Sequence, residues 1–154
     1  MSTLKTLLLA VDLAARNRDA AVQGLAQAEQ AVVAAHEQMA QLEGYAKETE
    51  TRWTVRGQIS TTPELMRHHY QFMDRLNHAM GLQQGVMRDR AARVEDARAI
   101  LLQAELRLAS LKKVCEKKRI AMAREQDRRE QREVDELAAT QHRNFSNNPT
   151  VGRS

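Results

Sequence analysis

The clearest pattern in the chain is an apolar residue at every seventh position. Nine consecutive members form this track: Met66, Met73, Met80, Met87, Val94, Leu101, Leu108, Cys115 and Met122. The track ends at Arg129. A seven-residue period is typical of a helix that packs along another helix in a left-handed coiled coil. The pattern therefore predicts one long helix and a second helix that packs against it.

The first third of the chain carries a similar pattern of its own. One track runs by sevens from Leu4 to Trp53, with Arg18 as its polar exception, and a companion track starts at Leu7 and is mostly alanine. Two apolar tracks three residues apart form the contact seam of a coiled coil. We therefore expect a first helix over about residues 3–54.

The stretch TVRGQISTTPEL, residues 54–65, interrupts both patterns. Thr61 or Thr62 followed by Pro63 is a typical helix start, because a threonine hydroxyl accepts an unpaired backbone N–H and proline is tolerated in the first turn. Glu64, three residues after Thr61, can complete a capping box. The stretch predicts a turn over about 55–61, a second helix over about 62–143 and a disordered tail over about 144–154.

Short connections join antiparallel helices, so the predicted fold is all-α: a long antiparallel two-helix coiled-coil hairpin that forms one domain. Folding the chain near residue 59 is expected to place Trp53 opposite Leu65 and to bring Arg90 near Glu29, a pair that would fix the register. The first helix is then used up before the second ends. Residues beyond Met122 are expected to continue as an overhanging single helix.

Composition supports a long helical protein. Aromatic residues make up 3% and charged residues 29% of the 154 residues, which is typical of coiled coils rather than of compact cores. The net charge is +4, but acidic and basic residues alternate along the chain. This pattern favours a solvated helix face, so no nucleic-acid partner is expected, and a basic nucleic-acid-binding helix is the weakest alternative.

No pattern indicates catalysis, a metal or a cofactor. His68 and His69 are adjacent and point to different helix faces, and no third ligand accompanies either of them at helical spacing. No glycine-rich phosphate loop or nucleophile motif is present. We therefore expect a protein that is not an enzyme, with no catalytic, cofactor-binding or metal-binding residues.

The single cysteine and the apolar runs bear on the cellular compartment. Cys115 is alone, so it cannot form an internal disulfide, and it fits a reducing compartment and a packing role. The apolar N-terminal run is cut at Asp12, which argues against a signal peptide, and no run approaches the length of a membrane span.

A further apolar row lies beside the seam of the second helix. It consists of the residues one step before the first methionines: Leu65, Phe72, Ala79 and Val86, with Leu76 nearby. Tyr45 holds a similar place on the first helix. A two-helix hairpin has no third layer to cover these side chains, and aromatic residues gather near the turn, so we expect a binding patch there. Alternatively, these residues cap the hairpin end or pair two copies into a four-helix bundle.

Several short motifs carry a family resemblance. They are the Leu-rich N-terminal pattern, D-A-A at 19–21, Q-L-x-x-Y at 41–45, Y-Q-F-x-x-x-L-x-x-A at 70–79 and E-Q-x-x-x-D-E at 130–136. With these motifs in this order, the chain resembles the FliJ family of the flagellar type III export apparatus from about residue 4 to 143.

The resemblance implies an antiparallel hairpin similar to the central stalk of rotary ATP synthases. It further implies a non-enzymatic adaptor that binds the hexameric export ATPase FliI with the end that carries both termini, contacts the export gate FlhA and escorts flagellar export chaperones. Such a protein would couple ATP hydrolysis to substrate entry. It would be cytoplasmic, monomeric and peripheral to the inner membrane through its partners.

The resemblance also implies site residues. For the export gate these are Gln38, Leu42, Tyr45, Phe72, Leu76 and Ala79; for the export ATPase they are Gln131, Asp135 and Glu136. Thr49 stands where the family has a second tyrosine at the gate surface. The alternatives are a structural homodimeric coiled coil and the stalk protein of a virulence type III secretion system.

Overall fold

The computed structural model describes residues 3–57 and 61–147 and contains two helices. Helix α1 spans Thr3–Gly57 and α2 spans Pro63–Ser146. No strand occurs in these two ranges, and the two helices pack against each other, so the all-α coiled-coil hairpin is confirmed. Helix α1 continues to Gly57 rather than ending near residue 54, and α2 continues to Ser146 rather than ending near 143. The remainder of the expected turn and tail, 58–60 and 148–154, lies outside the described residues.

The start of α2 shows which of the two threonines, Thr61 or Thr62, is the N-cap. The backbone N–H of Leu65 donates to Thr62 Oγ1 at 3.3 Å, and the N–H of Met66 donates to the Thr62 carbonyl at 3.1 Å. Thr62 is therefore the N-cap, and Pro63 occupies the first helical position, where its missing N–H costs nothing. Glu64 then follows the cap by two residues, so the capping box expected with Thr61 does not fit this start.

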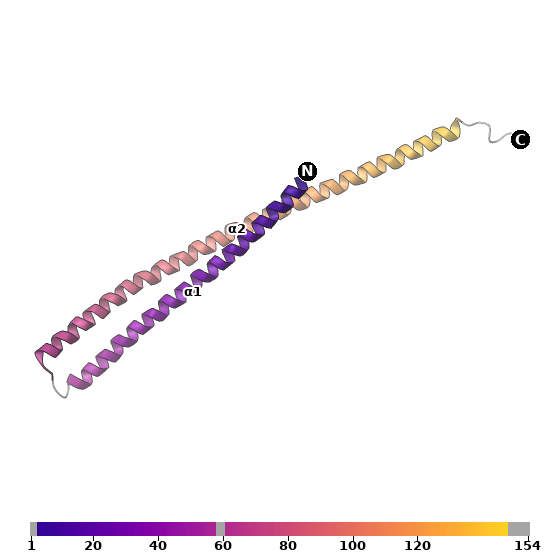
Figure 1. The fold of residues 1–154 in the computed structure, drawn as a ribbon. Helices are drawn as coiled ribbons and strands as arrows, with labels where there is room; N and C mark the ends of the chain where they lie inside the picture. Colours follow the sequence, from indigo (N-terminus) through magenta and orange to yellow (C-terminus); the bar gives the residue numbers. More distant parts are fainter. Residues whose placement is uncertain (1–2, 58–60, 148–154) are drawn as a thin grey trace. The chain divides into compact units, whose positions relative to one another are not determined.

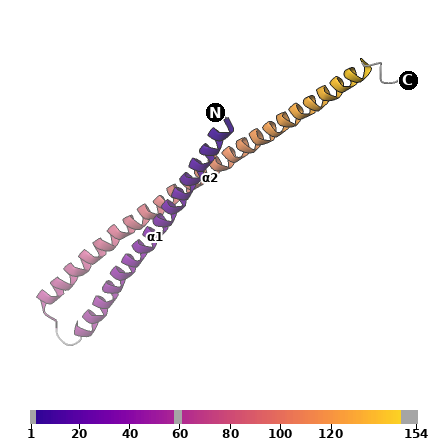
Figure 2. The same cartoon turned by 45° about the vertical axis from the view of Figure 1, so that its right-hand side comes forward.

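The chain divides into two compact units. The first joins Met1–Ala14 to Arg107–Ser154, and the second is Ala15–Leu106. In the second unit, α1 and α2 run side by side in opposite directions (Figures 1 and 2). Its buried apolar residues are Ala35, Met39, Leu76 and Val94. They lie on the seven-residue tracks, so the seam predicted from the sequence is the core of this unit.

Near the turn, the register differs from the expected one. Trp53 stacks on His69, with ring centroids 4.3 Å apart and planes inclined by 5°, whereas it was expected to face Leu65, about one helical turn away. Met66 was expected to begin the seam but is 39% exposed, so this prediction was wrong. The Trp53 ring, at the last position of the α1 track, lies against His69 instead of covering Met66.

A glutamine in the seam links the two helices. Gln83 Nε2 donates to the Ala35 carbonyl at 2.8 Å and to Gln38 Oε1 at 3.1 Å. Gln83 belongs to the companion track, three residues after Met80, so its amide points at α1. A shift of α1 by one turn would break both bonds, and a polar residue in an apolar seam is a known means of fixing register.

The predicted register pair does not form. Arg90 Nη1 bonds Asp89 Oδ2 at 2.6 Å, and Glu29 makes no ion pair within the described residues. Glu29 instead lines a shallow groove that includes Val94 and Arg98. The prediction that Arg90 pairs with Glu29 was wrong. Its register agrees with the Gln83–Ala35 contact, but the Arg90 guanidinium bonds its neighbour Asp89 instead. Gln83 takes the register role.

Replacing Gln83 tests this role. Gln83→Ala is expected to lower the free energy of unfolding by about 1 kcal/mol, because two interhelical hydrogen bonds are lost. Gln84→Ala, at an exposed neighbouring position, should leave it nearly unchanged. Urea denaturation followed by circular dichroism measures both. Equal effects of the two substitutions would contradict the register role.

The first unit has a short buried seam of its own. Residues 3–14 of α1 lie beside the part of α2 that starts at Arg107, and Ala14, Leu108 and Cys115 are buried between them. At 6% exposure, Cys115 is a packing residue, as expected. Met122 is 43% exposed because α1 does not reach it. Beyond it, α2 continues past the described start of α1 (Figures 1 and 2), and 123–146 are exposed except for the half-buried Glu125.

Candidate partner-binding surfaces

The first candidate surface lies in the second unit, between two interhelical contacts. The Gln83–Gln38 hydrogen bond closes it at one side and the Trp53–His69 stack at the other. The segment between Gln38 and Trp53 on α1 therefore runs alongside the segment between His69 and Gln83 on α2. All six residues implied for the export gate fall within these two segments, so the fold brings them to one stretch of the hairpin.

These six residues differ in how much of each side chain is exposed to solvent. Tyr45 is 59% and Phe72 is 47% exposed, whereas Leu42 and Ala79 are half-buried. Gln38 is exposed and accepts the hydrogen bond from Gln83. The two aromatic side chains are therefore the groups that a partner would meet first. Large, half-exposed aromatic residues are the type that most often anchors protein interfaces.

Leu76 has a different place from the one expected. It was grouped with the exposed row beside the seam, but it is only 8% exposed. Leu76 follows Met73 by three residues and therefore belongs to the companion track, which faces α1. The prediction that Leu76 presents its side chain beside the seam was wrong. Its side chain packs in the core beneath the surface that carries Tyr45 and Phe72.

Other apolar side chains extend this surface toward the turn. Leu65, Met66 and Tyr70 are exposed, and Tyr70 also lies 5.8 Å from His69, centroid to centroid. The Trp53–His69 stack thus has further aromatic and apolar groups around it. The expected clustering of aromatic residues near the turn is present in the structure.

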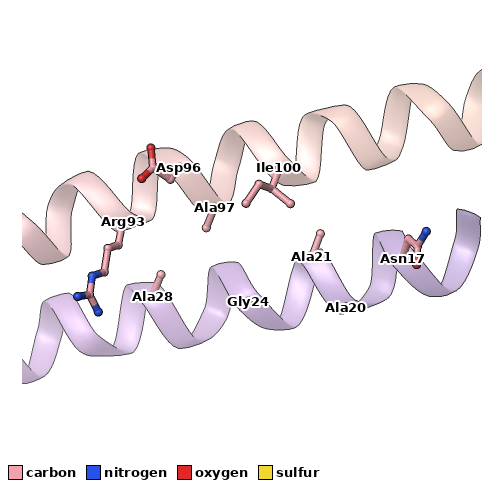
Figure 3. A pocket seen from close by; sticks show the side chains of 9 residues that line it. All are labelled: Asn17, Ala20, Ala21, Gly24, Ala28, Arg93, Asp96, Ala97 and Ile100. Atoms are coloured by element: carbon pink, nitrogen blue, oxygen red, sulfur yellow. The ribbon is translucent and has the colours of Figure 1, made fainter.

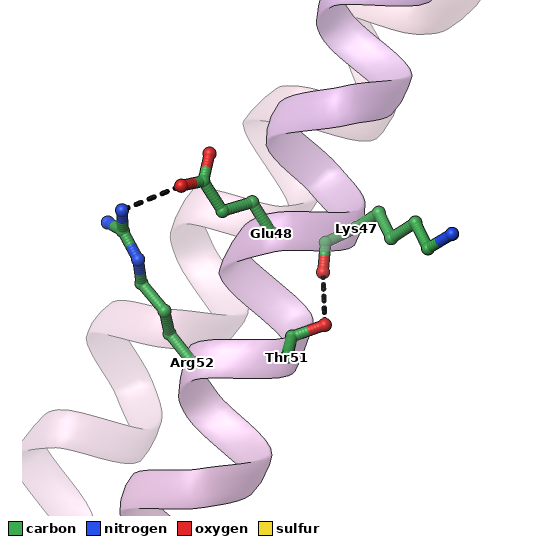
Figure 4. Close-up of polar contacts among 4 residues, drawn as sticks. All are labelled: Lys47, Glu48, Thr51 and Arg52. Atoms are coloured by element: carbon green, nitrogen blue, oxygen red, sulfur yellow. Dashed lines mark hydrogen bonds and ion pairs between the residues drawn. The ribbon is translucent and has the colours of Figure 1, made fainter.

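Two side-chain contacts lie on the α1 edge of this region (Figure 4). Arg52 Nη2 donates to Glu48 Oε1 at 2.7 Å, one turn along the same helix. Thr51 Oγ1 donates to the Lys47 carbonyl at 2.9 Å, so its hydroxyl is satisfied within α1. Exposed pairs of this kind stabilise a helix only slightly. Their effect here is that Glu48 and Arg52 offset each other's charge beside the aromatic surface.

The second candidate surface is the exposed end of α2 in the first unit. Gln131 Nε2 donates to Asp135 Oδ1 at 3.2 Å, and Glu136 is exposed beside them. Val134 and Leu137 are about three-fifths exposed between these polar residues, since no other described helix covers them. An uncovered helix with polar groups around an apolar pair is suited to bind inside a protein partner.

One feature of the second unit had no counterpart in the sequence-based expectations. A shallow groove lies between the helices (Figure 3). It is lined mostly by small residues of α1 and by Arg93, Asp96, Ala97 and Ile100 of α2. The signal was present in the sequence, because alanine and glycine recur beside the α1 seam around Gly24. The register was needed to show that Ile100 lies across from them.

The described residues contain no group of three or more His, Cys, Asp or Glu side chains that could hold a metal ion. Within the same residues, neither helix has a window apolar enough to cross a membrane.

A comparison with known proteins identifies a family that the sequence matches. The model of the family described as flagellar FliJ protein matches residues 1–146. No curated protein and no solved structure matches the sequence. The matched range includes both helices and both candidate surfaces.

Proposed function

Because the chain belongs to the flagellar FliJ protein family and is thus a component of the flagellar export apparatus, we propose that it is an adaptor between the export ATPase and the export gate. The family is one of non-enzymatic structural and adaptor proteins. In this role the protein couples ATP hydrolysis to substrate entry, receives export chaperones and is held at the inner membrane by its partners.

The contact with the export gate is proposed for the aromatic surface of the second unit. Tyr45 from α1 and Phe72 from α2 are exposed there on the same stretch of hairpin, and Leu76 and the Gln83 hydrogen bonds hold the backbone beneath them. A rigid pair of aromatic residues loses little conformational entropy on binding. This exposed pair is the observation that carries the proposed gate contact.

The contact with the export ATPase is proposed for the end of α2. An isolated α-helix is about 10–12 Å wide including its side chains, which suits insertion between the subunits or into the pore of a ring. Gln131, Asp135 and Glu136 supply polar contacts, and Val134 with Leu137 supplies the apolar ones. All five are exposed and so are available to a partner.

A single substitution tests the gate contact. Phe72→Ala is expected to weaken binding to the purified cytosolic domain of the export gate by roughly tenfold, or about 1–2 kcal/mol, because it removes an exposed aromatic anchor. The helical circular dichroism signal should not change. Isothermal titration calorimetry measures the affinity.

Leu102→Ala is the matched control, since Leu102 is 56% exposed on α2 but lies on a different face of the helix. It should leave the affinity as in the unsubstituted chain. Equal weakening by both variants would show that the binding surface is not the one proposed.

A further inference from the structure

The two sides of the seam in the second unit differ in how many charged residues they carry. On one side, two rows run along the hairpin, which we call the apolar flank: Asn17, Gly24, Ala31, Gln38 and Tyr45 on α1, and Phe72, Ala79, Val86, Arg93 and Ile100 on α2. In an antiparallel pair these rows lie on the same side of the seam. The corresponding α1 row on the other side includes Glu29, Glu43 and Glu50. Apart from Arg93, which pairs with Asp89, the apolar flank carries no charged side chain, unlike this α1 row on the other side.

One end of the apolar flank is hollow. The groove of Figure 3 is floored by Ala21, Gly24 and Ala28 from α1 and is bounded by Ala97 and Ile100 from α2. Arg93 and Asp96 lie at one end of it and Asn17 at the other. A Cβ atom added at Gly24 would meet nothing within 4 Å, so packing within the hairpin does not require glycine here. Glycine inside a helix costs about 1 kcal/mol relative to alanine. Without a side chain at Gly24, the groove stays open at this position.

The other end of the apolar flank projects. Tyr45 and Phe72 are its large side chains, and each keeps about half of its surface exposed. The flank thus has two aromatic side chains at one end and a hollow of small residues at the other. This is the pattern of a self-complementary surface, in which each end of one copy fits the opposite end of a second copy.

We propose that a second copy of this chain packs antiparallel on the apolar flank, with the twofold axis at Val86. Phe72 precedes Val86 by as many residues as Ile100 follows it, so Phe72 of one copy meets Ile100 of the other. Val86 meets its own counterpart on the axis. The region of overlap is the whole second unit, and the product is a four-helix bundle.

The same axis places Tyr45 at the groove. The Gln83 hydrogen bonds and the Trp53–His69 stack set Val86 at the level of about residues 32–36 on α1. Tyr45 lies about 9–13 residues from that level, so it falls in the other copy alongside about residues 19–27, the part of α1 that lines the groove. A tyrosine ring entering there fills the space that Gly24 leaves open.

Two charges at the edge of α2 support this pairing. Arg75 and Asp96 make no ion pair within the residues that the structure describes. Arg75 precedes the axis residue by about as much as Asp96 follows it, so each copy places its Arg75 opposite the Asp96 of the other. The symmetry creates this pair twice, which gives charge complementarity in addition to the fit of shape.

The pairing covers Tyr45 and Phe72. Self-association and the gate contact therefore exclude each other, and the copies must separate before the gate binds. This consequence rests on the proposed function, whereas the pairing itself does not.

Sedimentation equilibrium of the full chain tests the pairing by charge reversal. The unsubstituted chain should show a concentration-dependent equilibrium of monomer and dimer. Arg75→Asp and Asp96→Arg should each raise the dimer dissociation constant by about tenfold, because each change turns two attractions into two repulsions. The double variant should recover most of the original affinity. Arg88→Asp and Asp74→Arg, exposed charges on another face of α2, are the matched controls and should have no effect.

Two further variants fix the geometry. Val86→Cys in a Cys115→Ser background should form a disulfide-linked dimer on mild oxidation, whereas Leu102→Cys in the same background should not. Gly24→Leu should keep the helical signal and abolish the dimer, because its side chain fills the groove. A chain that stays monomeric at all concentrations, or a double charge variant that fails to recover, overturns the proposal; the flank is then left to a helix of another protein.

Discussion

Leu76→Ala is expected to lower the free energy of unfolding by about 2–4 kcal/mol, the usual cost of removing a buried leucine side chain and leaving a cavity. Leu76 is the least exposed side chain among the six residues implied for the gate contact, at 8%. A two-helix seam has no second layer that could close over the cavity, so little relaxation is expected. Thermal and urea unfolding followed by circular dichroism measure the loss.

Phe72→Ala provides the comparison, because Phe72 lies one turn from Leu76 and is 47% exposed. Its removal should cost less than about 1 kcal/mol of stability, since much of its surface is in water in the free protein. The two substitutions thus separate a core role from a contact role. If Leu76→Ala left the unfolding curve unchanged but weakened gate binding directly, Leu76 would be a contact residue and its place in the seam would be wrong.

Removal of residues 123–154 is expected to abolish binding to the export ATPase, with an affinity loss of roughly a hundredfold or more, equivalent to about 3 kcal/mol. The reason is that this segment contains Gln131, Asp135 and Glu136 together with the exposed apolar pair. Pull-down and calorimetry with the purified ATPase measure the loss.

The truncated chain should remain folded. Of the described residues that are removed, Glu125 alone is half-buried and the rest are exposed, so no core contact is lost. Its thermal midpoint should therefore match that of the full chain, and binding to the gate should be unaffected. Collapse of the whole helical signal would show that the end of α2 is needed for folding, and retained ATPase binding would place the ATPase contact elsewhere.

The seven-residue pattern was sufficient to predict the helices and their antiparallel packing. Periodicity identifies which side chains face a second helix because burial of an apolar stripe decides helix packing. Val94, Leu108 and Cys115, predicted from spacing alone, are all buried. The family match over residues 1–146 is consistent with the resemblance carried by the short helical motifs.

The register of the two helices was harder to predict than the helices themselves, for a physical reason. A heptad pattern looks the same after a shift of one turn or one repeat, so the apolar residues do not distinguish neighbouring alignments. What selects the alignment here is a pair of particular contacts, the Gln83 hydrogen bonds and the Trp53–His69 stack. Apolar spacing also does not show that Arg90 bonds its neighbour Asp89 in place of Glu29.

Leu76 and Phe72 show that residues one turn apart in the candidate site can differ in burial. The two residues are four apart, yet one faces α1 and the other faces outward. Sequence spacing placed both near the edge of the seam, and only the packed structure separates them. The groove around Gly24 was missed for a related reason, because it depends on which α2 residues lie across from the small residues of α1.

The stacked indole of Trp53 has a practical consequence. It is the only tryptophan in the chain, and its ring is held against the His69 imidazole. Its fluorescence therefore reports on a single place, and a change in emission that precedes the loss of the helical signal would record local fraying at that point without any attached label.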